Sequence, residues 1–236
     1  MPTLHTTTSP VQVDANTALA VGAPATADAA AWSRYYEELY HDAAEDPARV
    51  PWAHLRPCPF LQAWLNTEAP SLLRPGATAC VVGCGLGDDV KELSDRGYDA
   101  IGFDVSASAI QWARRRFPEL SDRFHIADLF DLPASLKRRS DLVVEINTLQ
   151  ALHPALREHA AAGIAALARP RGLVLTVCRG RDSSQPVGDA PPHAISPEEL
   201  GELFGRQAMA PLRAADDFLD DRTPPVRRLR CCFKRG

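Results

Sequence analysis

The sequence has no long apolar run, few lysines and no excess of positive charge. No run approaches the roughly 20 apolar residues of a membrane-spanning helix, so we expect no membrane partner. Its 26 Lys and Arg residues face 30 Asp and Glu residues, and the formal charge of −4 argues against a nucleic-acid partner. Lysine occurs only at Lys91, Lys137 and Lys234, none of them in a P-loop or Schiff-base motif.

Cysteine is present without the pattern of a disulfide framework or a zinc site. No CxxC pair occurs among the six cysteines, and their spacing does not match zinc ligands. We therefore expect a reduced, cytoplasmic protein with no metal site. These cysteines are Cys58, Cys80, Cys84, Cys178, Cys231 and Cys232.

The first 30 residues contain neither Lys nor Arg and no leucine-rich core, which excludes a secretory signal and a basic transit peptide. We expect residues 1–28 to be a disordered leader. The remaining chain, 29–236, has the length and apolar content of one domain.

The N-terminal part of that domain has its own pattern. Aromatic and leucine residues spaced by three and four predict an amphipathic helix over 29–44. Prolines then break the chain before a second apolar helix that includes 60–65. The helical stripe consists of Trp32, Tyr35, Tyr36, Leu39 and Tyr40.

Short apolar runs alternate with helical patterns along the rest of the chain. Helices are expected over 88–97, 106–120, 149–167 and 196–205, the last opened by a Ser196–Glu199 capping box. Because the runs are apolar on both faces, they predict a doubly wound, parallel α/β sheet covered on both sides. The strands are expected at 77–85, 99–105, 123–130, 140–146 and 172–178, with two more near 208–218 and 226–233.

A glycine-rich turn follows the first predicted strand directly. Gly83, Cys84, Gly85 and Gly87 lie where a backbone can approach a ligand closely. Asp104 ends the next strand 21 residues beyond Gly83, followed by Val105, and an acid at that place can accept both hydroxyls of a ribose. The pair predicts a nucleoside site.

The charges beside the turn narrow the choice of nucleoside. Asp88 and Asp89 open the following helix, where they would repel a diphosphate and occupy the helix dipole. S-adenosylmethionine carries no phosphate and fits better than a nicotinamide or flavin dinucleotide. An empty structural turn is the third possibility.

Two further loops are expected at the same edge of the sheet. After the third strand, Asp128 can accept from an adenine amino group while Leu129 covers the ring, although an ordinary capped turn is the alternative. After the fourth strand, Glu145 and Asn147 can bind the cofactor ammonium or line the acceptor pocket, or lie in solvent.

Together these segments resemble the class I methyltransferases of the thiopurine S-methyltransferase and tellurite-resistance type. The resemblance rests on Trp32 and Tyr36 with Pro51-Trp52, and on the stretches VVGCGLGDDVKELSDRGYDAIGFDV, ADLFDLP, DLVVEINTLQALHPALR and APPHAISPEELGELFG. It implies a Rossmann-like, seven-stranded sheet whose last strand is antiparallel. It also implies an N-terminal lid over about 29–68 that brings Trp32, Tyr36 and Trp52 to the cofactor.

The same resemblance places His153 and His193 near the substrate, as candidates for a general base. His54 is a lid candidate for substrate binding, and Arg179 could recognise a substrate carboxylate. The alternatives are a helix cap for His153, a solvated loop for His193, a hydrogen bond within the lid for His54, and pairing of Arg179 with Asp182. Where the thiopurine group often has Asp-Arg, this chain has Glu145-Ile146, so no arginine role carries over.

We therefore expect a metal-independent enzyme that methylates a small molecule at sulfur, oxygen or nitrogen. Sulfur or another soft atom is the preferred acceptor. The enzymatic alternative is a nicotinamide-dependent oxidoreductase. The other alternative is a non-catalytic protein that only binds S-adenosylmethionine. The sequence does not indicate an oligomeric state.

Overall fold

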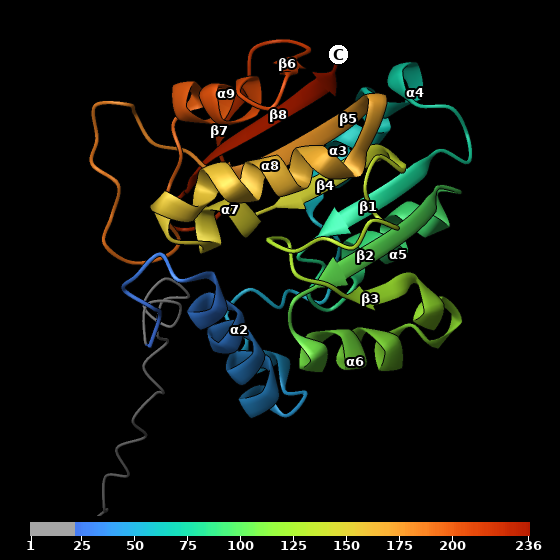
Figure 1. Ribbon diagram of the computed structural model, residues 1–236, viewed down its shortest axis with the longest axis vertical. Helices are drawn as coiled ribbons and strands as arrows, with labels where there is room; N and C mark the ends of the chain where they lie inside the picture. The colour runs from blue at the N-terminus through green and yellow to red at the C-terminus, as the bar shows by residue number, and fades with distance from the viewer. Residues whose placement is uncertain (1–21) are drawn as a thin grey trace, which may run out of the picture.

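The computed structural model describes residues 22–236, which form an α/β fold around one eight-stranded sheet. Its strand order is β3-β2-β1-β4-β5-β8-β6, with β7 also paired to β8 (Figure 1). The first five strands run parallel, and β8 (Arg227–Arg235) enters antiparallel to β5, as expected for the last strand. The parallel strands are β1 (Thr78–Val82), β2 (Asp99–Asp104), β3 (Phe124–Ile126), β4 (Ser140–Ile146) and β5 (Ala168–Arg179).

The outer edge beyond β8 is where the predicted strand count fails. β6 (Met209–Pro211) and β7 (Asp216–Leu219) both pair antiparallel with β8, at its last and first residues respectively. They fill one edge position in two pieces, separated by residues 212–215, where the chain bends away from β8. Seven positions therefore contain eight strands.

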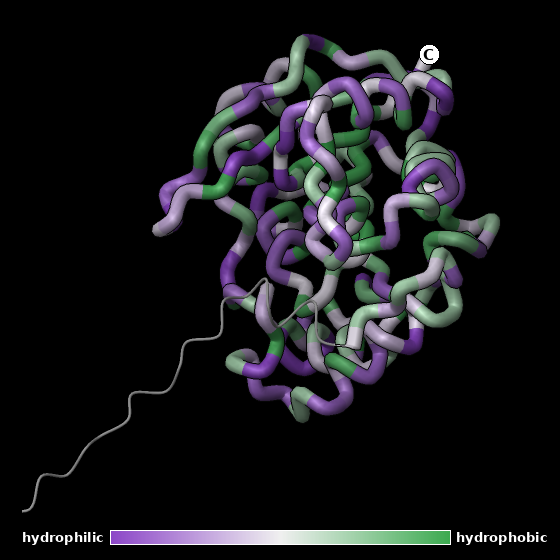
Figure 2. Tube along the Cα trace, turned by 90° about the vertical axis from the view of Figure 1, so that its left-hand side faces the viewer, coloured by the Kyte–Doolittle hydropathy of each residue, from purple (hydrophilic) through white to green (hydrophobic). Residues whose placement is uncertain are grey.

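Helices cover both faces of the sheet and bury it. On one face lie α8 (Arg157–Leu167) and α9 (Pro197–Gly205), preceded by the short α7 (Thr148–Ala151). The other face holds α3 (Pro59–Thr67), α5 (Asp88–Asp95) and α6 (Ala107–Arg116), with α4 (Ala69–Leu72) after α3. Figure 2 shows the apolar stretches gathered inside the fold. The 3₁₀ turns are Pro47–Arg49, Pro118–Arg123 and Pro154–Leu156.

Helix boundaries follow local chemistry, with three departures from prediction. The helix expected over 106–120 ends at Arg116, because Pro118 opens a 3₁₀ turn. The helix expected over 149–167 is interrupted, because Pro154 opens a new turn and the His153 ring accepts from Ala155 N–H. Ser196 caps α9 by accepting from Glu199 N–H at 3.1 Å. The reciprocal half of the capping box is absent, because the Glu199 carboxylate pairs with Arg157 and Arg181 instead.

The predicted N-terminal helix is α2 (Ala29–Ala43), which lies beyond the carboxyl ends of the parallel strands (Figure 1). Residues 1–21 of the expected leader lie outside the described residues. Within 22–28, Asp28 caps α2, and the Thr26 carbonyl accepts from the Trp32 indole at 2.9 Å. No helix in the described part of the chain is long and apolar enough to cross a membrane.

Candidate functional site

The glycine turn is shaped by left-handed backbone that side chains resist. Gly83 and Gly85 have φ of 58° and 50°. A Cβ at Gly85 would lie 2.8 Å from the Tyr40 hydroxyl, and one at Gly83 would lie 2.7 Å from Thr148 Oγ1. The turn is therefore in close contact with both the N-terminal helix and the residue that opens α7.

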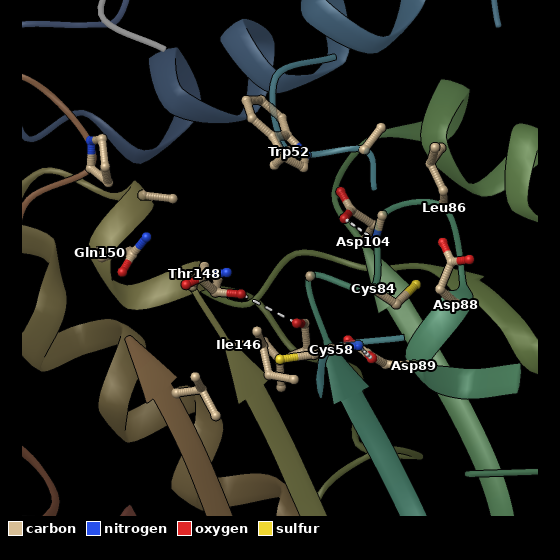
Figure 3. A pocket seen from close by; sticks show the side chains of 18 of the residues that line it. Trp52, Cys58, Cys84, Leu86, Asp88, Asp89, Asp104, Ile146, Thr148 and Gln150 are labelled. Carbon is tan, nitrogen blue, oxygen red and sulfur yellow. Dashed lines mark hydrogen bonds between the residues drawn. The ribbon is translucent and has the colours of Figure 1, made fainter. Parts of the chain in front are cut away.

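Asp104 closes the turn from the neighbouring strand (Figure 3). Its Oδ2 accepts from Gly85 N–H and its Oδ1 from Ser106 N–H, both at 3.0 Å. Burial raises the pKa of this carboxyl, and the backbone bonds oppose that rise without cancelling it. Each oxygen keeps a further lone pair, so the carboxylate can still accept from two hydroxyls.

The two acids after the turn differ from the prediction. Asp88 makes two bonds to the Arg116 guanidinium, at 2.6 and 2.7 Å, so its charge is balanced rather than repulsive. Asp89 accepts from Cys58 N–H at 2.7 Å, and burial raises its pKa to about 6. Asp88 is therefore not an open charge as the prediction assumed, whereas both carboxylates do occupy the start of α5.

Aromatic side chains cover the site on the side opposite the strand ends and form its aromatic roof. Trp52 donates its indole N–H to the Tyr40 hydroxyl at 2.7 Å, and its ring lies edge-on to Tyr36 and Tyr40 at 5.9 Å. Tyr36 donates to the Ala151 carbonyl at 2.7 Å, which ties α2 to α7. In Figure 3 Trp52 lies across the cavity from the strand ends. Tyr40 belongs to the predicted stripe but was not predicted to be a site residue.

A cavity of about 370 Å³ connects these parts and suits a small-molecule ligand. Asp128 lines it from the loop after β3, with Oδ1 held by Phe130 N–H at 2.8 Å. Trp32 also lines it but is only 1% exposed, so its main role is packing. The predicted site residues that line the cavity are Trp32, Tyr36, Trp52, His54, Gly83, Cys84, Gly85, Asp104, Val105, Asp128, Leu129, Asn147 and Arg179.

Two residues predicted to contact the cofactor do not line the cavity. Gly87, at φ 87°, opens α5 against the Phe124 ring and is structural. Glu145 is fully buried, with Oε1 accepting from Leu149 N–H at 2.9 Å and Oε2 unpartnered within the described residues. Burial raises its pKa to about 7. Side chains alternate along a strand, so its neighbour Ile146 reaches the cavity instead.

Neither predicted candidate for a general base lies at the cavity. His153 caps the turn that begins at Pro154, as the alternative interpretation expected. His193 is 3% exposed, and its Nδ1 lies 2.8 Å from the Gly188 carbonyl. The two rings lie near each other, 6.4 Å between centroids, behind Gln150 and Pro192. The structure does not support a direct catalytic role for either.

One wall of the cavity was missed from the sequence. It is formed by Arg56, which precedes α3, and Phe60 in its first turn, and by Asp220, Arg222 and Arg228 around the β7–β8 turn. The only signal was a cluster of charged residues between the last two predicted strands. Asn147 lies next to this wall, with Oδ1 3.5 Å from Arg228 Nη1.

The side chains that line the cavity, all among residues 22–236, are not arranged to bind a metal ion. Within residues 22–236 no group of three or more His, Cys, Asp or Glu side chains is placed to hold one ion. All six cysteines are free, and burial raises the pKa of the Cys58 and Cys84 thiols that line the cavity. The glycine turn, two carboxylates and aromatic roof instead fit the ribose, adenine and sulfonium of S-adenosylmethionine.

Comparisons with known proteins point to the methyltransferases. Residues 80–172 match a family model described as a methyltransferase domain. A probable thiopurine S-methyltransferase of Yarrowia lipolytica is 28% identical over 179 residues, covering 65% of this chain and 81% of that protein. A probable thiol methyltransferase 2 of Arabidopsis thaliana is 25% identical over 159 residues, covering 66% of each.

Among solved structures, the fold is similar to that of 1,6-didemethyltoxoflavin-N1-methyltransferase from Burkholderia thailandensis. The TM-score is 0.68 at 20% identity, and the match covers 92% of this chain and 93% of that one. That structure contains bound S-adenosylhomocysteine and 1,6-didemethyltoxoflavin. The family model, the relatives and the fold agree: the chain has the fold of the class I, S-adenosylmethionine-dependent methyltransferases and is similar in sequence to a probable thiopurine S-methyltransferase and a probable thiol methyltransferase.

Proposed function

We propose that this protein transfers the methyl group of S-adenosylmethionine to a soft nucleophile of a small molecule, with a thiol as the first candidate. The observation that carries the proposal is one cavity, of about 370 Å³, that joins the glycine turn to a separate charged wall. The two relatives, a probable thiopurine S-methyltransferase and a probable thiol methyltransferase, support sulfur as the acceptor atom.

Each part of the cavity then has a role toward the cofactor. Asp104 accepts from the ribose hydroxyls, and Asp128 accepts from the adenine amino group under Leu129. The faces of Tyr36 and Trp52 stabilise the sulfonium by cation–π attraction, which contributes about 0.5–2 kcal/mol. Bound S-adenosylmethionine supplies a methyl carbon already activated for displacement.

The protein itself contributes position and exclusion of water. A thiolate needs no general base for an in-line displacement, so the rate acceleration comes from orientation and desolvation. This agrees with the positions of His153 and His193 away from the cavity. Among residues 22–236, His54 is the histidine that lines the cavity, at the charged wall.

Calorimetric titration with S-adenosylhomocysteine, with NAD as control, tests the cofactor assignment. We expect micromolar binding of the first and none of the second; NAD binding would revive the oxidoreductase alternative. An acceptor screen with thiols, phenols and amines then tests the reaction. Binding of S-adenosylhomocysteine without methylation of any acceptor would favour the non-catalytic alternative.

A further inference from the structure

Two segments far apart in the sequence form the charged wall of the cavity. The 54–60 segment belongs to the lid expected over about 29–68, and the β7–β8 hairpin lies near the C-terminus. The Phe60 and Phe218 rings pack edge-on at 5.1 Å, and Arg230 Nη1 donates to the Phe60 carbonyl at 3.0 Å. At the cavity, His54 Nε2 lies 3.3 Å from Arg222 Nη2. The two segments that form the wall are therefore packed and hydrogen-bonded to each other.

This wall carries more positive than negative charge. Asp220 is buried and already satisfied, because it accepts from Arg228 Nε at 2.9 Å and from Val226 N–H at 2.8 Å. Arg222 approaches the same carboxylate only at 3.4 Å, through Nε. Asp221 also lines the cavity, so the three arginines of the wall, Arg56 included, exceed its two acids.

Arg56 and Arg222 keep donors available for a ligand. Arg56 lines the cavity, and within residues 22–236 its guanidinium has no hydrogen bond or ion pair. The Arg222 side chain is 41% exposed. A guanidinium donates in a fixed fork that matches a carboxylate, and charged groups lining a cavity without partners favour a ligand of opposite charge.

His54 contacts Arg222 without competing for an anion. A guanidinium can only donate, so Nε2 of His54 must be the acceptor in its contact with Arg222. Burial and the nearby Arg222, Arg56 and Arg228 lower the pKa of His54, which keeps the ring neutral at pH 7. A neutral imidazole can therefore orient Arg222 along the cavity wall.

We infer that Arg56 and Arg222, the latter oriented by His54, form an anion-binding subsite for a carboxylate, or a comparable anionic substituent, of the methyl acceptor. The inference rests on the proposed function, since it names the acceptor class of the same cavity. His54 is a positioning residue in this arrangement, because it acts through Arg222.

A pair of acceptors that differ only in charge tests the subsite. The full-length protein is assayed with 4-mercaptobenzoate and with its methyl ester at pH 8, where both thiols are ionised. We expect kcat/KM to favour the acid by about tenfold or more, mainly through KM. R56Q and R222Q should bring the two acceptors to near equality. R74Q, an exposed arginine before β1, is the matched control and should keep the preference.

The positioning role of His54 has its own variants. H54Q retains a side-chain oxygen that can accept from Arg222 and should keep most of the preference, whereas H54L should lose it. Equal kcat/KM for acid and ester in the unmodified protein, or a preference unchanged by R56Q and R222Q, would overturn the subsite while leaving the methyltransferase proposal intact.

A binding measurement separates the two proposals if neither thiol is methylated. That result would count against a thiol acceptor. The subsite is then judged by calorimetry with the same two compounds and the S-adenosylhomocysteine-bound protein. Tighter binding of the acid, lost in R56Q and R222Q, would support the subsite, and equal binding would reject it.

Discussion

The two sides of the cavity differ in charge and in origin. The side next to the glycine turn carries the carboxylates of Asp89, Asp104 and Asp128, and it comes from consecutive βα units. The opposite wall carries Arg56, Arg222 and Arg228, and it comes from the lid linker and the last hairpin. The acidic side favours a ligand with a sulfonium, and the basic side favours an anionic acceptor. The difference in charge therefore determines where in the cavity each of the two substrates binds.

Removing the central acid should break the acidic side most strongly. Asp104→Ala loses the acceptor for two ribose hydroxyls and the anchor of Gly85 N–H, so S-adenosylhomocysteine affinity should fall about 100-fold. Calorimetry measures the loss. Asp95→Ala, at the exposed end of α5, is the matched control and should bind normally. Unchanged affinity in D104A would refute the ribose assignment.

Adding one methyl group to the glycine turn tests how closely Gly85 approaches Tyr40 of the N-terminal helix. Gly85→Ala puts a Cβ at positive φ, 2.8 Å from the Tyr40 hydroxyl, and should cost about 1–3 kcal/mol of unfolding free energy and weaken cofactor binding. Gly201→Ala in α9 meets nothing within 4 Å and should instead stabilise by about 0.5–1 kcal/mol. Urea unfolding compares them, and equal effects would contradict the geometry.

The pH dependence of stability probes the buried acid beside the turn. Asp89 has a folded pKa of about 6, raised by burial, so between about pH 4 and 6 the folded protein holds a proton that the unfolded chain releases. Stability should therefore fall as pH rises through that window. Asp89→Asn should remove this decline, on the order of 1 kcal/mol. Parallel unfolding curves against pH for the two proteins would show that Asp89 is charged throughout.

The smallest effect is expected from a segment assigned to neither side of the cavity. We propose that deleting residues 2–21 leaves S-adenosylhomocysteine affinity and unfolding free energy unchanged. Asp28→Ala removes the cap of α2 and should cost about 1 kcal/mol. A large loss of affinity on deletion would mean that the leader completes the lid.

The acidic side was predictable because its parts are local. The turn, Asp104 and Asp128 each follow a strand directly, and parallel neighbours bring their carboxyl ends to one edge. Strand patterns also located β4 at its observed bounds. Two predictions failed for different reasons, the first because of a residue outside the motif and the second because of the strand's own alternation. Arg116 neutralises Asp88, and the alternation of β4 turns Glu145 inward.

The sequence by itself determined the alternation of strands and helices, the glycine turn and its acid, because periodicity and spacing act over about 20 residues. Only the tertiary structure decided the basic wall. His54 and Arg222 are 168 residues apart and meet because β8 inserts antiparallel beside β5 and returns its hairpin to the lid linker. Such a contact depends on how strands are ordered in the sheet, which no local pattern encodes.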